Sequence, residues 1–128
     1  MSNRPMILVA EPEEAVRESI QIILREEGCN CHAVGDCTSL LRAIRIHESC
    51  LIIADIHIVY DNVGEILAAL THYATIPPLL IMVSYERIGD MLYLMKFGIT
   101  EYLIKPFTFE ELLEHIQKTI IPKPNTPI

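Results

Sequence analysis

Short runs of apolar residues recur along the chain and constrain its fold more than any other feature. The strong runs, at 6–10, 51–54 and 79–83, show no alternation of apolar and polar residues, and weaker runs lie at 31–34 and 102–104. An uninterrupted apolar run of this length is typical of a strand buried on both faces of a parallel sheet. The sequence therefore predicts five strands of this kind.

Amphipathic stretches with helical periodicity lie between the apolar runs. Gly28 is expected to follow the end of the first helix, and Asp36 is expected to cap the start of the second. The third and fourth helices are predicted over about 64–73 and 87–97. The fifth begins with a capping box, Thr108 and the Glu three residues later, and is expected to end at Pro122.

Five strands that alternate with five helices make βα units, which pack as a parallel sheet with helices on both faces and right-handed crossovers. A chain of 128 residues is the usual size of one domain. We expect residues 5–121 to form that domain and the proline-rich residues 122–128 to be a tail or the start of a linker.

Composition excludes several classes of protein. A hydrophobic fraction of 51% is too high for a disordered chain, and no apolar run approaches the ~20 residues of a membrane span. Ten basic against seventeen acidic residues give a net charge of −7, which opposes direct nucleic-acid binding. No N-terminal stretch has the pattern of a signal peptide, so we expect a cytoplasmic location. We also expect free thiols, rather than disulfides or a zinc site, at the four cysteines Cys29, Cys31, Cys37 and Cys50.

Chemically useful residues follow the apolar runs. Glu11 comes after the first predicted strand, Asp55 after the third, Ser84 after the fourth and Lys105 after the fifth. In an open α/β sheet, ligands bind at the carboxyl ends of the strands, so these side chains are expected to converge. Carboxylates suit a hard cation such as Mg²⁺, and a lysine beside them can neutralise a phosphoryl group.

This pattern resembles the response regulator receiver domain of two-component signalling. The resemblance covers residues 5 to about 120 and rests on residues 7–11, Asp55, Ser84 and residues 102–107, Tyr-Leu-Ile-Lys-Pro-Phe. The last of these motifs, with a glycine seven residues before its lysine, is the most specific. The resemblance implies a flavodoxin-like, doubly wound (βα)5 fold with a five-stranded parallel sheet in the order 2-1-3-4-5.

The resemblance also implies a role for each matching residue. Asp55 would accept a phosphoryl group from a histidine kinase or a phosphotransfer protein. Lys105, with a cis peptide bond to Pro106, would pair with the phosphoryl oxygens. Ser84 would form a hydrogen bond to one of those oxygens after modification, and Tyr102 would be the aromatic switch residue that then turns inward.

For the metal, the resemblance implies that Glu11, Asp55 and the backbone carbonyl of His57 bind Mg²⁺. The family usually has a second acid where this chain has Pro12, which offers no carboxylate and no N–H. We therefore expect weak Mg²⁺ binding.

Spacing also departs from the family near Ser84. Ser84 lies one residue closer to Lys105 than is usual, so either Ser84 or Val83 occupies the hydroxyl position. Ser84 is favoured because Val83 completes an apolar run.

Three functions are compatible with these residues. The first is a phosphorylated receiver, which would signal through the surface of helix 87–97, strand 102–104 and the last helix to a partner protein, an effector domain or a second copy. The second, favoured by Pro12, is a degenerate receiver that acts as an interaction module without phosphorylation. The third is a phosphatase of the haloacid dehalogenase type, with His57 in place of the usual acid, but the chain has no room for a cap domain. We expect a receiver and not an enzyme.

Overall fold

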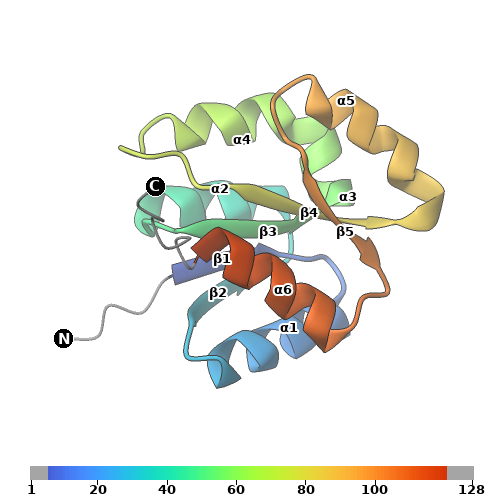
Figure 1. The fold of residues 1–128 in the computed structure, drawn as a ribbon. Helices are drawn as coiled ribbons and strands as arrows, with labels where there is room; N and C mark the ends of the chain where they lie inside the picture. The colour runs from blue at the N-terminus through green and yellow to red at the C-terminus, as the bar shows by residue number, and fades with distance from the viewer. Residues whose placement is uncertain (1–5, 121–128) are drawn as a thin grey trace, which may run out of the picture.

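The computed structural model describes residues 6–120, which form a parallel sheet between two layers of helices (Figure 1). The strands lie in the order β2-β1-β3-β4-β5, so the predicted fold class and strand order are confirmed. Their bounds are Met6–Ala10 (β1), Asn30–Val34 (β2), Leu51–Asp55 (β3), Leu79–Ser84 (β4) and Glu101–Lys105 (β5). The predicted tail, with the helix end expected at Pro122, lies outside the described residues.

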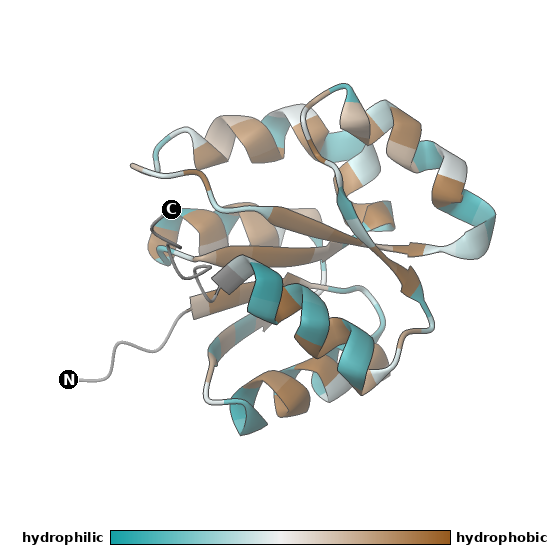
Figure 2. Ribbon diagram, viewed as in Figure 1, coloured by the Kyte–Doolittle hydropathy of each residue, from teal (hydrophilic) through white to brown (hydrophobic). Residues whose placement is uncertain are grey.

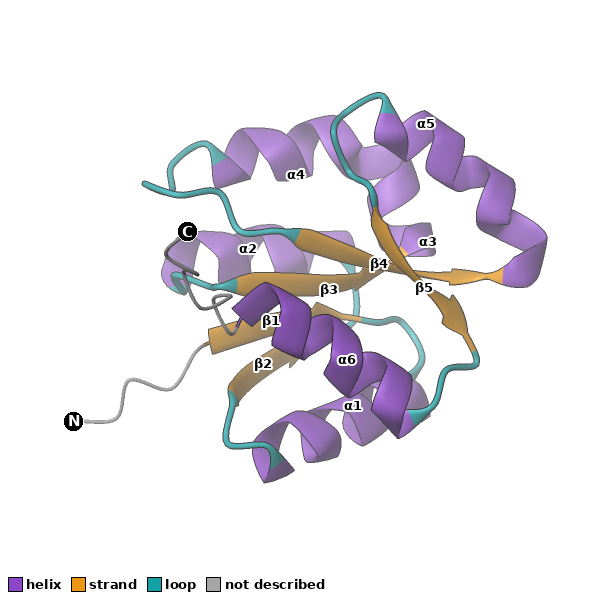
Figure 3. Ribbon diagram, in the orientation of Figure 1, coloured by secondary structure: helices purple, strands orange, loops and turns teal. Residues whose placement is uncertain are grey.

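Two groups of helices cover the two faces of the sheet, as the ribbon in Figure 3 shows. Helices α1 and α6 pack on one face, and α2, α4 and α5 pack on the other. Their bounds are Glu14–Glu26 (α1), Cys37–Ile46 (α2), Ile56–Val59 (α3), Val63–Leu70 (α4), Met91–Met95 (α5) and Phe109–Ile120 (α6), with 3-10 segments at Tyr60–Asn62 (η1) and Tyr85–Asp90 (η2). No helix within the described residues is long and apolar enough to cross a membrane.

The central strands are apolar on both faces because each face is covered by helices (Figure 2). In β1, Leu8 and Ala10 face the core under α2 and α4, whereas Ile7 and Val9 face the core under α1 and α6. All five residues of β3 are buried. The edge strands β2 and β5 have exposed residues, which explains why their apolar runs are weaker in the sequence.

Three of the helix ends expected from the sequence, at Gly28, Asp36 and Thr108, are confirmed. Gly28 follows Glu27, the C-cap residue of α1, and has φ +82°, a left-handed conformation that favours glycine. The Asp36 carboxylate accepts the N–H of Ser39 at 2.8 Å at the start of α2. At α6, the Thr108 hydroxyl accepts the N–H of Glu111 at 3.1 Å, and the Glu111 carboxylate accepts the Thr108 N–H at 3.2 Å.

Two helices differ from the predicted ranges. The third, α4, ends at Leu70 rather than near residue 73, and Thr71 and Tyr73 turn their hydroxyls to backbone carbonyls instead: Thr71 to Ala68 at 2.6 Å, Tyr73 to Ile44 at 2.8 Å.

The fourth predicted helix starts as η2 and becomes α-helical only at Met91. Arg87 Nε and Asp90 Oδ2, three residues apart, are 2.7 Å from each other, a pairing that suits the eclipsed side chains of a 3-10 helix. Segments α3 and η1, directly after β3, were not predicted.

The α6 capping box gives a stability prediction. Replacing Thr108 with Ala removes the acceptor of the Glu111 N–H and is expected to lower the free energy of unfolding by about 1 kcal/mol, the usual cost of losing an N-cap hydroxyl. Thr108→Ser keeps the hydroxyl and should stay close to the wild type. Urea denaturation followed by circular dichroism measures both variants, and equal stability of Thr108→Ala and the wild type would contradict the prediction.

Candidate functional site

The sheet brings the predicted residues together at the carboxyl ends of its strands. The β1–β3 register pairs Ala10 with Ala54, one residue before Glu11 and Asp55, and the β4–β5 register pairs Ser84 with Lys105. A pocket of about 400 Å³ lies at this edge. It is lined by Glu11, Pro12, Glu13, Asp55, His57, Ser84 and Lys105.

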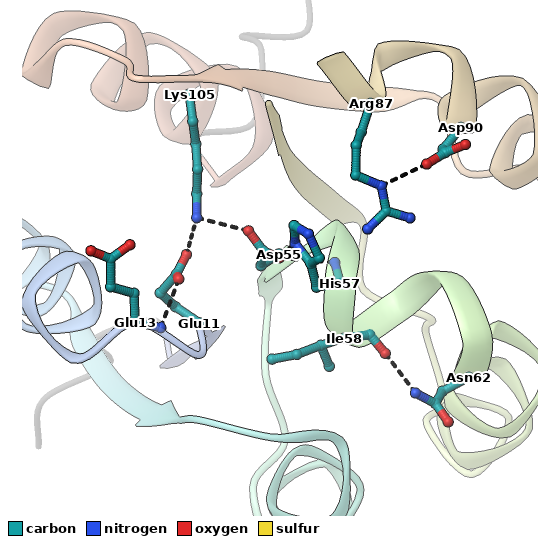
Figure 4. Close-up of polar contacts among 9 residues, drawn as sticks. All are labelled: Glu11, Glu13, Asp55, His57, Ile58, Asn62, Arg87, Asp90 and Lys105. Carbon is teal, nitrogen blue, oxygen red and sulfur yellow. Dashed lines mark hydrogen bonds and ion pairs between the residues drawn. The ribbon is translucent and has the colours of Figure 1, made fainter. Parts of the chain in front are cut away.

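Lys105 joins the two buried carboxylates of the pocket (Figure 4). Its Nζ donates to Asp55 Oδ2 at 2.7 Å and also to Glu11 Oε1. Glu11 is 1% exposed and Asp55 is 3% exposed. Burial of a carboxylate is costly without a counter-charge, and here one ammonium group serves both.

The pKa values of Asp55 and Lys105 move in opposite directions. Burial alone would raise the pKa of Asp55, but the hydrogen bonds from Lys105 and from His57, together with the Lys105 charge, hold it below its ordinary value. Burial alone would lower the pKa of Lys105, but its bonds to Asp55 and Glu11 and their charges raise it. Asp55 is therefore an ionised carboxylate and Lys105 a cation at neutral pH.

The second oxygen of Asp55 is held by His57. Asp55 Oδ1 accepts the backbone N–H of His57 at 2.8 Å and lies 2.7 Å from its ring Nδ1. Because an ionised carboxylate only accepts hydrogen bonds, Nδ1 carries the hydrogen. Asp55 thus caps α3. The sequence analysis missed the ring contact, because it considered His57 as a metal ligand through its carbonyl and as a proton donor in a phosphatase, but not as a partner of Asp55.

Three further hydrogen bonds hold the β1–α1 loop. Glu11 Oε2 accepts the N–H of Glu13 at 2.9 Å. Arg17, on α1, donates Nη1 to the backbone carbonyls of Glu11 at 2.8 Å and Pro12 at 3.4 Å. The bonds from Arg17 direct both carbonyls toward its guanidinium group. The sequence analysis did not predict this role of Arg17.

The remaining predicted residues lie where the pattern places them. Ser84 lines the pocket, whereas Val83 is fully buried in the core. The Lys105–Pro106 bond is cis. Tyr102 is 36% exposed on β5, on the outer edge of the sheet and outside the pocket.

No group of three or more His, Cys, Asp or Glu side chains within residues 6–120 is placed to hold a metal ion. The four cysteines are free thiols. In the pocket, the carboxylates of Glu11 and Asp55 are the buried oxygen donors, and each of their oxygens already accepts a hydrogen bond from Lys105, His57 or Glu13.

Comparison with known proteins decides the family. Residues 7–117 match the model of the response regulator receiver domain. The chain belongs to this family. MtrA, a DNA-binding response regulator of Mycolicibacterium paratuberculosis, is 25% identical over 114 residues, 89% of this chain and 50% of that protein. The response regulator PmrA of Pseudomonas aeruginosa is 28% identical over 111 residues, 87% of this chain and 50% of that protein.

Solved receiver structures share the fold. A receiver domain protein from Clostridium thermocellum superposes with a TM-score of 0.78 at 24% identity, covering 91% of this chain and 94% of that chain. A two-component response regulator from Clostridium difficile gives a TM-score of 0.81 at 20% identity, covering 96% of this chain and all of the other.

Family membership sets the general role. Receiver domains are signalling modules of two-component systems, generally not enzymes, that interact with histidine kinases and effector domains and generally bind Mg²⁺. The chain spans about half the length of the curated relatives it matches.

Replacement of Lys105 tests the ion-pair network. Lys105→Met leaves two buried carboxylates without their cation and should lower the free energy of unfolding at pH 7 by about 3 kcal/mol. In the wild type, the lowered pKa of Asp55 gives stability above its unfolded pKa that is lost as the pH falls through the folded pKa. The variant should instead gain stability on mild acidification, because protonation removes its uncompensated charges.

Urea denaturation from pH 4 to pH 8 measures both effects. Lys118→Met is the matched control, because Lys118 and Glu114 form an exposed pair at 3.5 Å, and such pairs contribute less than about 1 kcal/mol. If the two variants have the same pH profile, the network does not stabilise the fold.

Proposed function

We propose that this receiver accepts a phosphoryl group on Asp55 and transmits its presence through the surface formed by α5, β5 and α6. The observation that carries the proposal is the Lys105 ammonium group, 2.7 Å from a buried, ionised Asp55 at the floor of an open pocket. An ionised carboxylate needs no base to act as a nucleophile, and a fixed cation beside it stabilises the charge that develops on a transferring phosphoryl group.

The proposed step is a displacement at phosphorus. An oxygen of Asp55 attacks the phosphohistidine of a kinase or phosphotransfer protein and forms an O–P bond. The P–N bond breaks, and its electron pair returns to the imidazole of the donor, which takes a proton from solvent. Lys105 then shifts from the carboxylate to the phosphoryl oxygens, and Ser84, beside Lys105 in the sheet register, donates its hydroxyl to one of them.

A continuous set of contacts links this pocket to the proposed output surface. Asp55 is the N-cap of α3, and η1 begins directly after α3 at Tyr60. The ring centroids of Tyr60 and of Tyr93 on α5 are 4.8 Å apart. Tyr93 in turn lies 5.2 Å from Phe97. Movement of α3 after modification of Asp55 would therefore reach α5 through packed side chains.

The proposed output surface carries apolar side chains open to solvent. They are Leu92, Met95, Phe97, Tyr102 and Ile104, from α5, the segment after it and β5. Inward rotation of Tyr102, as the proposed switch, would change the shape of this surface. A partner protein, an effector domain or a second copy of the chain would bind there.

This arrangement does not suit a metal ion at the expected Mg²⁺ ligands, which are Glu11, Asp55 and the carbonyl of His57. Pro12 removes one acid, and the carboxylate oxygens that remain already accept hydrogen bonds. The proposed mechanism therefore relies on Lys105 and contains no step through a metal.

Treatment with a small acyl phosphate tests the acceptor. We expect a phosphoryl adduct, visible by intact-mass spectrometry and released by hydroxylamine as acyl phosphates are, on the wild type and not on Asp55→Asn. Asp61→Asn, an exposed aspartate on η1, is the matched control and should keep the adduct. If no adduct forms with or without Mg²⁺, the chain is a receiver that works without phosphorylation.

A further inference from the structure

We infer that this pocket functions without a divalent cation. The His57 ring contacts Oδ1 of Asp55, an oxygen that a bound metal would have to share. Two observations carry this inference. The first is the loss of oxygen donors on the β1–α1 loop, where Pro12 replaces an acid and the neighbouring carbonyls are bonded to Arg17, and the second is the bond between His57 and Asp55. The inference depends on the proposed function only where it concerns phosphoryl transfer; the metal measurement below does not.

The first observation concerns oxygen donors on the β1–α1 loop. A hard divalent cation needs several oxygen ligands, and carboxylates contribute most to its affinity. Pro12 supplies none from its side chain, and Arg17 binds the carbonyls of Glu11 and Pro12, so the backbone does not replace the lost acid. Glu13 lies at the mouth of the pocket, but its side chain is exposed.

The second observation concerns Asp55 itself. Its Oδ1 accepts both the backbone N–H and the ring Nδ1–H of His57, and its Oδ2 accepts from Lys105. A cation bound to Oδ1 would have to displace the imidazole, because that oxygen already accepts two hydrogen bonds, whereas one bound to Oδ2 would have to share that oxygen with the Lys105 ammonium group. At Oδ1 the exchange would replace a formed hydrogen bond with a metal bond that lacks its usual second acid, and at Oδ2 the cation would lie beside a positive charge.

The His57 ring is well suited to this position. Its side chain is 59% exposed, so it approaches Asp55 from the solvent side of the pocket while the carboxylate stays buried. Because the ring and the backbone N–H belong to one residue, they hold Oδ1 from two directions and fix the rotation of the carboxylate. His57 is thus a positioning residue that directs Oδ2 toward Lys105 and the open pocket.

Magnesium titration of the unmodified protein tests the metal half of the inference. Amide signals of the pocket are followed by ¹⁵N NMR as MgCl₂ is raised through the millimolar range at constant ionic strength. We expect no saturable shift at residues 11, 55 and 57 in the wild type and a saturable shift in Pro12→Asp, which restores the acid. Saturable millimolar binding by the wild type would overturn the inference.

A second pair of variants tests the role of the ring. His57→Ala in the Pro12→Asp background should tighten Mg²⁺ binding several-fold, because the competing Nδ1–H is gone while the backbone carbonyl remains. An unchanged affinity would show that the ring does not compete with a cation. If Glu13→Gln abolishes binding in an otherwise unchanged chain, Glu13 has replaced the missing acid and the inference is wrong. Circular dichroism confirms that each variant is folded.

The reaction supplies a separate readout. Adduct formation from the acyl phosphate is compared in Mg²⁺ and in EDTA. The wild-type rates should agree within a factor of about two, whereas Pro12→Asp should be accelerated by Mg²⁺ at least ~10-fold, the effect of about 1.4 kcal/mol of added stabilisation. A wild-type rate that falls in EDTA would overturn the inference. Absence of any adduct would overturn the proposed function. The Mg²⁺ titration would then still test whether the pocket binds a metal ion.

Discussion

A single ammonium group shared by two buried carboxylates holds the carboxyl edge of this sheet together. Lys105 lies 94 residues from Glu11 and 50 from Asp55 in the sequence, so its bonds tie β5 to β1 and β3. Strand β4 lies between β3 and β5, and the lysine side chain must therefore reach past the end of β4, which is the small residue Ser84. Without that cation, the two carboxylates would repel each other in a buried site.

Much of the fold could be predicted from the sequence because burial on both faces leaves a strong pattern. The runs at 6–10, 51–54 and 79–83 became β1, β3 and β4, and the capping residues Asp36 and Thr108 start helices as expected. The edge strands gave weaker runs because water reaches them. The segment after β3 was missed because α3 has only four residues and is fixed by one side chain, Asp55, rather than by helical periodicity.

The candidate site could be predicted in outline for a different reason. Parallel topology places every strand end at one edge, so the position of a residue after an apolar run is enough to bring Glu11, Asp55, Ser84 and Lys105 together. Side-chain direction beyond a strand end is not fixed by spacing. The ring of His57 and the guanidinium of Arg17 were missed for that reason. Asp is a favoured N-cap residue, and that preference was the available signal that Asp55 would bond to the residue two positions later.

Asp55 has two roles, because one of its oxygens caps α3 and the other bonds to Lys105 in the candidate site. Its Oδ1 caps α3 through His57, and its Oδ2 bonds to Lys105, so the carboxylate is at once a structural cap and the candidate acceptor. A phosphoryl group on either oxygen changes the bonding of that oxygen, and with it the restraint on α3 or on the end of β5. Strand β5 is part of the apolar surface, and α3 is linked to it through η1, where the ring of Tyr60 packs against that of Tyr93 on α5. Among the pocket residues that the structure describes, Asp55 alone bonds both to α3 and to the end of β5, so under the proposed function a change confined to this carboxylate would act on both segments at once.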